Sequence, residues 1–154
     1  MKKILDGNFP ITQGFGENPD NYAQFGLKGH NGVDFGCPTG TGVICPIDGK
    51  VVEASNDPTG YGLYLRIEND HEGCVFGHLK SQGVAKDTTI VVGMVIGKSN
   101  NTGNSTGPHF HFGYYPIPRD RSNGYAGYID PMPFLNSGTP TTPDPLSICN
   151  QRLG

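Results

Sequence analysis

Turn-forming residues recur so often along this chain that no long helix fits between them. Glycine occurs 24 times and proline 13 times among the 154 residues. Inside a helix, glycine costs about 1 kcal/mol and proline about 3 kcal/mol relative to alanine, so both confine regular structure to short segments. Hydrophobic residues make up only 34% of the chain, which indicates a small core. The sequence therefore predicts short strands joined by many turns and excludes a large helical bundle.

Several short segments have the residue pattern of β-strands. Leu63, Leu65 and Ile67 alternate with more polar neighbours, as in a strand with one buried face. The expected strands cover residues 43–47, 50–54, 63–68, 74–78, 91–96 and 109–115. Asp48-Gly49 predicts a tight turn between the first two, and residues 81–87 are the one stretch that could hold a turn of helix. This spacing of strands predicts an antiparallel all-β domain.

The length suits a single domain. We expect this domain to cover residues 1–135 and a flexible tail rich in proline and threonine to cover residues 136–154. The formal charge is −3 and no basic run occurs, so we expect no nucleic-acid partner. No apolar stretch is long enough to span a membrane. We expect the protein to be a monomer.

The cysteines and the N-terminal residues bear on where the protein works. Cys37, Cys45, Cys74 and Cys149 include no C-x-x-C pair, which argues against a structural zinc knuckle. We predict that the thiols are free and buried, and one or two disulfides are the alternative. Residues 1–7 contain two lysines with no apolar segment behind them, so we expect no signal peptide. A protein acting outside the cell would then have to leave by another route.

Two segments carry histidines in patterns that suit chemistry. In an extended Gly29–Gly36, His30 and Asp34 share one face with two glycines, so an imidazole and a carboxylate lie side by side. In 108–114, His109 and His111 point one way, whereas the aromatic residues between and after them form the opposite, core-facing stripe. This is the clearest period-2 segment of the chain. Its histidine face is expected to border a cleft or solvent.

The spacing of these residues predicts a metal site. A lone histidine is usually a surface or satisfied core residue, and His71, in a polar hairpin turn, is expected to be one. The other four histidines differ because they come with a carboxylate at fixed spacing and as an H-x-H pair. A catalytic zinc site needs three protein ligands and one open position. Two histidines and an aspartate meet that need and leave two histidines over, one of which is His78.

The ordered set of motifs resembles the lysostaphin-type (LytM-like) family of zinc endopeptidases that cut bacterial peptidoglycan. The resemblance rests on H-x-x-x-D at 30–34, G-H-L at 77–79 and G-N-S-T-G-P-H-F-H-F at 103–112, and it covers roughly residues 10–116. It implies a lysostaphin-like antiparallel β-sheet domain, the duplicated hybrid motif, with a central groove and long loops. One departure is Phe76, where family members often have tyrosine. We expect this to affect packing only.

The resemblance also implies the site residues. The zinc ligands would be His30, Asp34 and His111, with one Zn²⁺ per chain, and His78 and His109 would be catalytic histidines that do not bind the metal. No H-E-x-x-H occurs to supply a glutamate base. An imidazole, with an ordinary pKa of about 6.5, would therefore take the proton from water. Which of the two histidines does so stays open.

The expected activity is hydrolysis of peptide cross-links or bridges of peptidoglycan. A non-catalytic cell-wall-binding or virion structural module of the same fold is the alternative, and the complete set of five site residues argues against it. A lipoyl- or biotinyl-type carrier domain, suggested by residues 48–51, gives the histidines no role. With no signal peptide expected, the enzyme would reach the wall after release by lysis or from a phage particle. Otherwise it would be extracellular or periplasmic.

Overall fold

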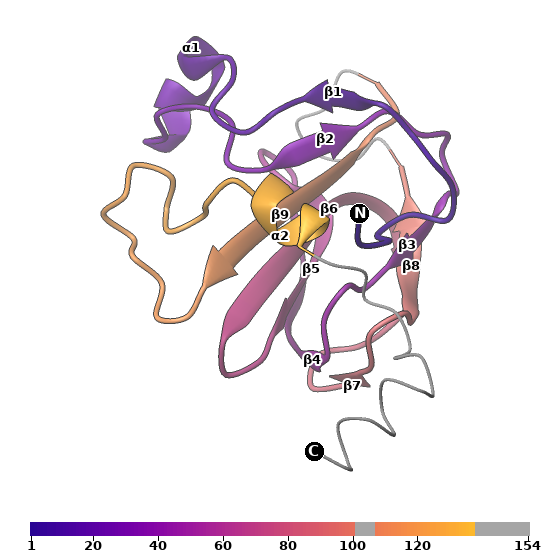
Figure 1. Ribbon diagram of the computed structural model, residues 1–154. Coiled ribbons are helices and arrows are strands. Elements are labelled where there is room, and N and C mark those ends of the chain that lie inside the picture. The colour runs from indigo at the N-terminus through magenta and orange to yellow at the C-terminus, as the bar shows by residue number, and fades with distance from the viewer. Residues whose placement is uncertain (101–106, 138–154) are drawn as a thin grey trace.

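The computed structural model describes residues 1–100 and 107–137, and most of its regular structure is β-sheet (Figure 1). The strands are β1 (Ile11–Gln13), β2 (Val33–Phe35), β3 (Gly42–Ile44), β4 (Gly49–Asp57), β5 (Gly62–Glu68), β6 (Glu72–Gln82), β7 (Thr89–Ile90), β8 (Val95–Ser99) and β9 (Phe110–Pro116). The helices are α1 (Pro19–Tyr22), the 3-10 turn η1 (Ala23–Phe25) and α2 (Met132–Asn136). The predicted all-β class is confirmed.

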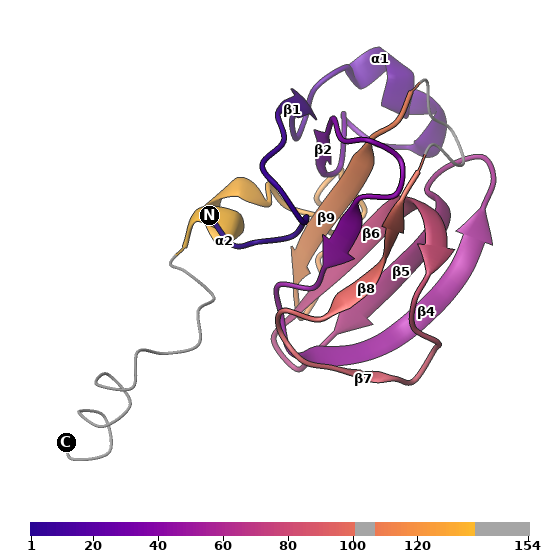
Figure 2. The same cartoon turned by 90° about the vertical axis from the view of Figure 1, so that its right-hand side faces the viewer.

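All strand pairs are antiparallel and belong to one sheet in the order β1-β2-β9-β6-β5-β4-β7. Strands β3 and β8 are not in this order but pair with each other. They belong to the same sheet because β8 also pairs with β6. Figure 2 shows β4, β5, β6 and β9 side by side as a twisted layer. The long strands β6 and β9 are central, so residues on their two faces decide where the core and the site lie.

The aromatic stripe of β9 is the centre of the core, as the alternation predicts. Phe110 and Phe112 are fully buried, and their ring centroids lie 6.2 Å and 5.6 Å from that of Phe76 on β6. Tyr114, the next residue on this face, stacks on Phe134 of α2 at 4.1 Å. Burying these rings provides much of the hydrophobic stabilisation of the domain. It also turns the side chains of His109 and His111 toward the opposite face of the sheet.

On that opposite face, glycines of β6 and β9 make room for large side chains. Gly73 lies opposite Tyr115, and a Cβ atom on Gly73 would lie 2.3 Å from Cζ of that ring. Gly113 lies opposite Val75, and a Cβ there would lie 2.6 Å from the valine Cγ1. Tyr115, Tyr128 and Val75 form a second, smaller core on this side of the sheet.

Two local predictions are wrong, the first because strand partners distant in sequence decide the pairing and the second because of a turn. The Asp48-Gly49 turn does not join a hairpin: β3 pairs with β8, whereas β4 pairs with β5 and β7. The Asp48 carboxylate instead accepts a hydrogen bond from the backbone N–H of Val92 at 2.8 Å. The expected strand 91–96 begins only at Val95, because Gly93 takes a φ of 94° in a turn before it.

The expected helical turn at 81–87 is also wrong. Ser81 and Gln82 end β6, and the residues that follow form turns. Helical turns occur instead at 19–25, within the loop between β1 and β2, and at 132–136. Pro19 and Pro133 lie in the first turns of α1 and α2, where a missing N–H costs nothing.

The three cysteines in the described part of the chain, Cys37, Cys45 and Cys74, are free and buried, as predicted. Cys149 lies outside the described residues, as does the expected tail from residue 138 onward. Among the residues that the structure describes, no helix is long and apolar enough to cross a membrane.

The fit of Gly73 against Tyr115 can be tested by one methyl group. Gly73→Ala should lower the free energy of unfolding by about 1–3 kcal/mol, because the buried tyrosine ring has no room to move. Gly42→Ala is the matched control, since its Cβ would meet no atom closer than 3.4 Å. Urea denaturation measures both. Equal stability of the two variants would contradict this account of the second core.

Candidate metal centre

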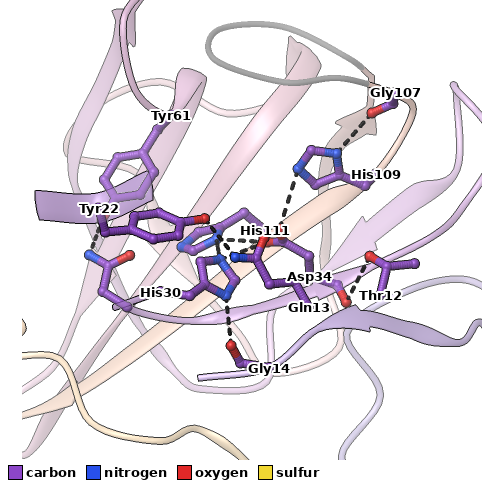
Figure 3. Close-up of polar contacts among 11 residues, drawn as sticks. Thr12, Gln13, Gly14, Tyr22, His30, Asp34, Tyr61, Gly107, His109 and His111 are labelled. Carbon is purple, nitrogen blue, oxygen red and sulfur yellow. Dashed lines mark hydrogen bonds and ion pairs between the residues drawn. The ribbon is translucent and has the colours of Figure 1, made fainter. Parts of the chain in front are cut away.

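The site is built where β2 pairs with β9. Asp34 of β2 lies directly opposite His111 of β9, and His30 comes from the turn that leads into β2 (Figure 3). The three residues are buried, with exposures of 2% for His30, 6% for Asp34 and 3% for His111. The last value differs from the expected open histidine face, because the ring of Tyr61 lies 5.2 Å from the His111 ring and covers it.

One atom from each residue points to a common centre. His30 Nε2 lies 3.2 Å from Asp34 Oδ1 and 3.1 Å from His111 Nδ1, and the last two atoms are 2.9 Å apart. In a tetrahedral zinc site with bonds of about 2.0–2.1 Å, ligand atoms are about 3.3 Å apart. The three atoms thus form a triangle close to one face of such a tetrahedron. This is the one group of its kind among the described residues.

The hydrogen-bond chemistry of this group calls for a cation. His30 Nδ1 lies 3.1 Å from the carbonyl oxygen of Gly14, which can only accept, so Nδ1 carries the hydrogen. In the neutral ring the Nε2 lone pair then points at a carboxylate oxygen. His111 Nε2 is buried with no hydrogen-bond partner, so this ring makes its polar contacts at Nδ1, on the side of Asp34 and His30. A divalent metal would satisfy all three inward-facing atoms.

The protonation states suit metal binding. Burial raises the pKa of Asp34, but the hydrogen bond with His111 and then the interaction with His30 outweigh it and hold that pKa well below its usual range. Burial lowers the pKa of His111, and the hydrogen bond to Asp34 opposes this only in part. Near neutral pH the group is therefore one carboxylate with a neutral His111, the form in which imidazole binds metals.

His78 and His109 lie next to this centre. Their ring centroids are 4.6 Å apart, and His109 Nε2 lies 3.6 Å from Asp34 Oδ2. His109 Nδ1 donates to the carbonyl of Gly107 at 2.8 Å, so the Nε2 lone pair faces the carboxylate side. All five predicted residues are thus brought together.

His78 has a left-handed backbone conformation, with a φ of 56°. Between the pairs Leu65↔Phe76 and Leu63↔Leu79, β6 contains one residue more than β5, so His78 lies in a bulge. Its N–H donates to Tyr61 O at 2.6 Å, and its carbonyl accepts from Asn100 N at 2.9 Å. Such strain in a residue other than glycine is common at functional sites.

A tyrosine lies at this site that no sequence pattern indicates. Tyr22, at the end of α1, has its ring 5.3 Å from that of His30, and Figure 3 shows its hydroxyl directed at the metal centre. Gln13 Nε2 donates to this hydroxyl at 2.9 Å. Burial and then the charge of Asp34 raise the pKa of Tyr22 to about 12, so the hydroxyl keeps its hydrogen at neutral pH.

A long loop, 14–29, lies beside the site. It carries α1 and η1 next to His30, whereas residues 101–106 lie outside the described part of the chain. Gly32 allows close approach of the backbone to the site, because a Cβ there would lie 2.6 Å from Cε1 of His111.

Comparison with known families and proteins gives consistent results. The sequence profile of Peptidase family M23 matches residues 28–125. Lysostaphin of Staphylococcus simulans is 37% identical over 149 residues, 90% of this chain and 28% of its own length. The peptidoglycan DD-endopeptidase ShyA of Vibrio cholerae is 40% identical over 109 residues, 70% of this chain and 25% of its own length. The chain spans roughly a fifth to a third of such relatives.

Solved structures show the same fold. The catalytic domain of lysostaphin from Staphylococcus simulans superposes with a TM-score of 0.71 at 34% identity, and the match covers 84% of this chain and 94% of that domain. A zinc-containing peptidase from Vibrio cholerae superposes with a TM-score of 0.69 at 32% identity, covering 84% of this chain and 38% of the other. The similarity thus extends across most of the described residues.

The lowered pKa of His111 predicts that the metal-free protein loses stability in mild acid. The unfolded chain binds a proton at His111 near pH 6.5, above the folded-state pKa, so this stabilisation is complete above about 6.5 and is lost as the pH falls. Asp34 adds a further loss below about pH 4. Melting temperatures of the metal-free protein between pH 7.5 and 5.5 should fall, and less steeply for His111→Asn. The exposed-turn variant His71→Asn should keep the parent slope, and identical slopes for all three proteins would contradict the shift.

The strain at His78 predicts an unusual order of stabilities. His78→Gly should be more stable than His78→Ala by about 1 kcal/mol, because only glycine adopts a positive φ without cost. Differential scanning calorimetry of the two variants in the metal-free state measures this difference. An alanine variant as stable as the glycine variant would show that the bulge relaxes to an ordinary strand conformation.

Proposed function

The chain belongs to peptidase family M23, and on this premise we propose that it is a zinc-dependent endopeptidase that hydrolyses peptide cross-links or bridges of bacterial peptidoglycan. The observation that carries the proposal is the convergence of His30 Nε2, Asp34 Oδ1 and His111 Nδ1 within 3.2 Å of one another. Relatives named lysostaphin, glycyl-glycine endopeptidase and peptidoglycan DD-endopeptidase support the substrate class.

We assign His30, Asp34 and His111 as the residues that hold zinc, one ion per chain. Three protein ligands leave one position open, as catalytic zinc sites require. A zinc ion held by these residues would polarise the scissile carbonyl and lower the pKa of water at that position. The two neutral imidazoles and one carboxylate leave a net positive charge on the loaded site, which favours the oxyanion of the tetrahedral intermediate.

His109 is the better placed of the two remaining histidines to act as base. The Gly107 carbonyl fixes its tautomer, so Nε2 has the lone pair and lies on the side of Asp34. It takes the proton of the attacking water. His78, in its protonated form and with its ring beside that of His109, donates a proton to the leaving amine, and the proton that His109 took from water then restores His78.

Tyr22 adds a hydrogen-bond donor to this set. Because Gln13 donates to its oxygen, the phenol hydrogen points elsewhere, and the ring position beside His30 directs it at the substrate carbonyl. A neutral hydroxyl with a pKa of about 12 gives this hydrogen bond without losing its proton. The protein would act on the cell wall. Its release by lysis or from a phage particle, and its monomeric state, remain predictions.

Alanine substitutions separate the proposed ligands from the proposed proton carriers. His30→Ala and His111→Ala should lose zinc and activity together. His78→Ala and His109→Ala should keep one zinc per chain and lose about 10²–10⁴-fold in rate, the usual contribution of a positioned acid or base. Metal analysis and release of amino groups from glycine-bridged and directly cross-linked peptidoglycan measure both quantities.

His71→Ala is the control for these variants, because His71 lies in an exposed turn. It should keep both zinc and activity. If His109→Ala lost the metal and His111→Ala did not, the two roles would be reversed. If the parent protein bound zinc but showed no hydrolysis sensitive to chelators, it would be a non-catalytic module of the family.

A further inference from the structure

His30 is held from both sides by one short stretch of chain, residues 14–17, here called the cradle segment. The Gly14 carbonyl accepts from the His30 ring at Nδ1 (3.1 Å), Gly16 N–H donates to the His30 carbonyl (2.7 Å), and His30 N–H donates to Glu17 O (2.9 Å). A Cβ atom on Gly29 would lie 2.4 Å from Gly16 O, so the two backbones are in close contact. The cradle segment thus sets both the position and the tautomer of this imidazole.

One hydrogen bond within the cradle segment joins Glu17 N–H to Gly14 O at 3.4 Å, and the segment is also held by contacts with other loops. It belongs to the loop between β1 and β2, and its contacts with the rest of the protein include a second loop, residues 117–130, here called the brace loop. Figure 1 shows the brace loop as the orange segment between β9 and α2. The ring of Tyr125 in this loop packs on that of Phe15 in the cradle segment, with centroids 4.5 Å apart.

The brace loop makes a second contact with Lys28, two residues before His30 in the chain. Lys28 N–H donates to the carbonyl of Gly124 at 2.9 Å, and the lysine stem packs on Gly124, where a Cβ would lie 2.5 Å from Cδ. The brace loop therefore contacts two places next to His30. These are Lys28, just before His30 in the chain, and Phe15 in the cradle segment. Neither contact involves a proposed ligand or catalytic residue.

One asparagine at the centre of the brace loop fixes its shape. Asn123 Oδ1 accepts from the N–H groups of Tyr125 (2.8 Å) and Gly127 (3.0 Å), and its Nδ2 donates to Tyr128 O (2.8 Å). Arg119 adds a hydrogen bond to Ala126 O at 2.9 Å and lies over the rings of Tyr115 and Tyr128. The loop is thereby anchored to the second core.

We propose that the brace loop sets the zinc affinity of the site, by holding the cradle segment against His30. Asn123 orders the loop, Tyr125 presses on Phe15, and the Gly14 carbonyl then keeps the His30 Nε2 lone pair on the metal side. Asn123 and Tyr125 are positioning residues, since neither touches the metal ligands. This inference rests on the zinc site of the proposed function. Partners that orient a ligand in this way typically contribute about 10–100-fold to metal affinity.

The chain contains a matched control for Asn123. Asn69, in the hairpin turn between β5 and β6, also accepts from two N–H groups, those of His71 (2.9 Å) and Glu72 (3.1 Å), and donates to one carbonyl, that of Asp48 (2.8 Å). Its hydrogen-bond partner Glu72 lies five residue pairs along the β6–β9 ladder from Gly77↔His111, a distance of about 17 Å. Removing either asparagine deletes the same kinds of bond, but only Asn123 belongs to a loop that contacts the cradle segment.

The test compares Asn123→Ala and Tyr125→Ala with Asn69→Ala and Tyr125→Phe, in the full chain. The zinc dissociation constant is measured by competition with a chromogenic chelator, and thermal unfolding of each metal-free variant gives its stability. We expect zinc binding about 10-fold weaker for the first two variants. It should be unchanged for the second two, because Tyr125→Phe keeps the ring on Phe15.

Equal zinc affinity of Asn123→Ala and Asn69→Ala at similar stability would overturn the proposal. So would a weakening in Asn69→Ala as large as that in Asn123→Ala, because the effect would then follow general stability. If Asn123→Ala or Tyr125→Ala does not fold, Asn123→Asp and Tyr125→Leu decide the matter by the same criterion. A parent protein that binds no zinc would instead refute the proposed function, so the two failures can be told apart.

Discussion

The pairing of β2 with β9 is the constraint on which the candidate site depends. This pairing is only three residues long, yet its register puts Asp34 opposite His111 and so joins two halves of the site that are 77 residues apart in sequence. The aromatic stripe on the other face of β9 holds the register, since a shift by one residue would exchange the buried rings for the histidines. Packing of the hydrophobic core on one face of β9 thus determines which residues of β2 and β9 meet on the other, polar face.

The polar face buries groups that lose their hydration when the protein folds. A carboxylate and two imidazoles are buried within 3.2 Å of one another, and one nitrogen of His111 has no partner. Buried groups of this kind normally cost free energy unless each is paired. A cation held between His30 Nε2, Asp34 Oδ1 and His111 Nδ1 would satisfy these three atoms, so metal binding and folding would be coupled. The strained backbone at His78 is a second local cost at the same place.

Much of the fold and most of the candidate site could be predicted from the sequence, because they depend on local pattern. The alternation in β9 predicts which of its faces is buried, and the spacing of His30 and Asp34 predicts that these two residues lie side by side. The Asp48-Gly49 hairpin failed because β4 takes its partners from 62–68 and 89–90, a choice that no dipeptide encodes. Tyr22 was missed for a similar reason: its place beside His30 depends on how a loop folds back, and no periodicity predicts that.

Two of the histidines are oriented by main-chain carbonyls, those of Gly14 for His30 and Gly107 for His109. Every residue type carries such a carbonyl, so the hydrogen bond itself places no demand on side-chain identity. The orientation of both imidazoles is therefore encoded in the path of two loops. In a set of related sequences the residues responsible would not stand out as invariant side chains. They would be visible only as a requirement on loop length and shape, and grafting the five site residues alone onto another β-sheet would leave that requirement unmet.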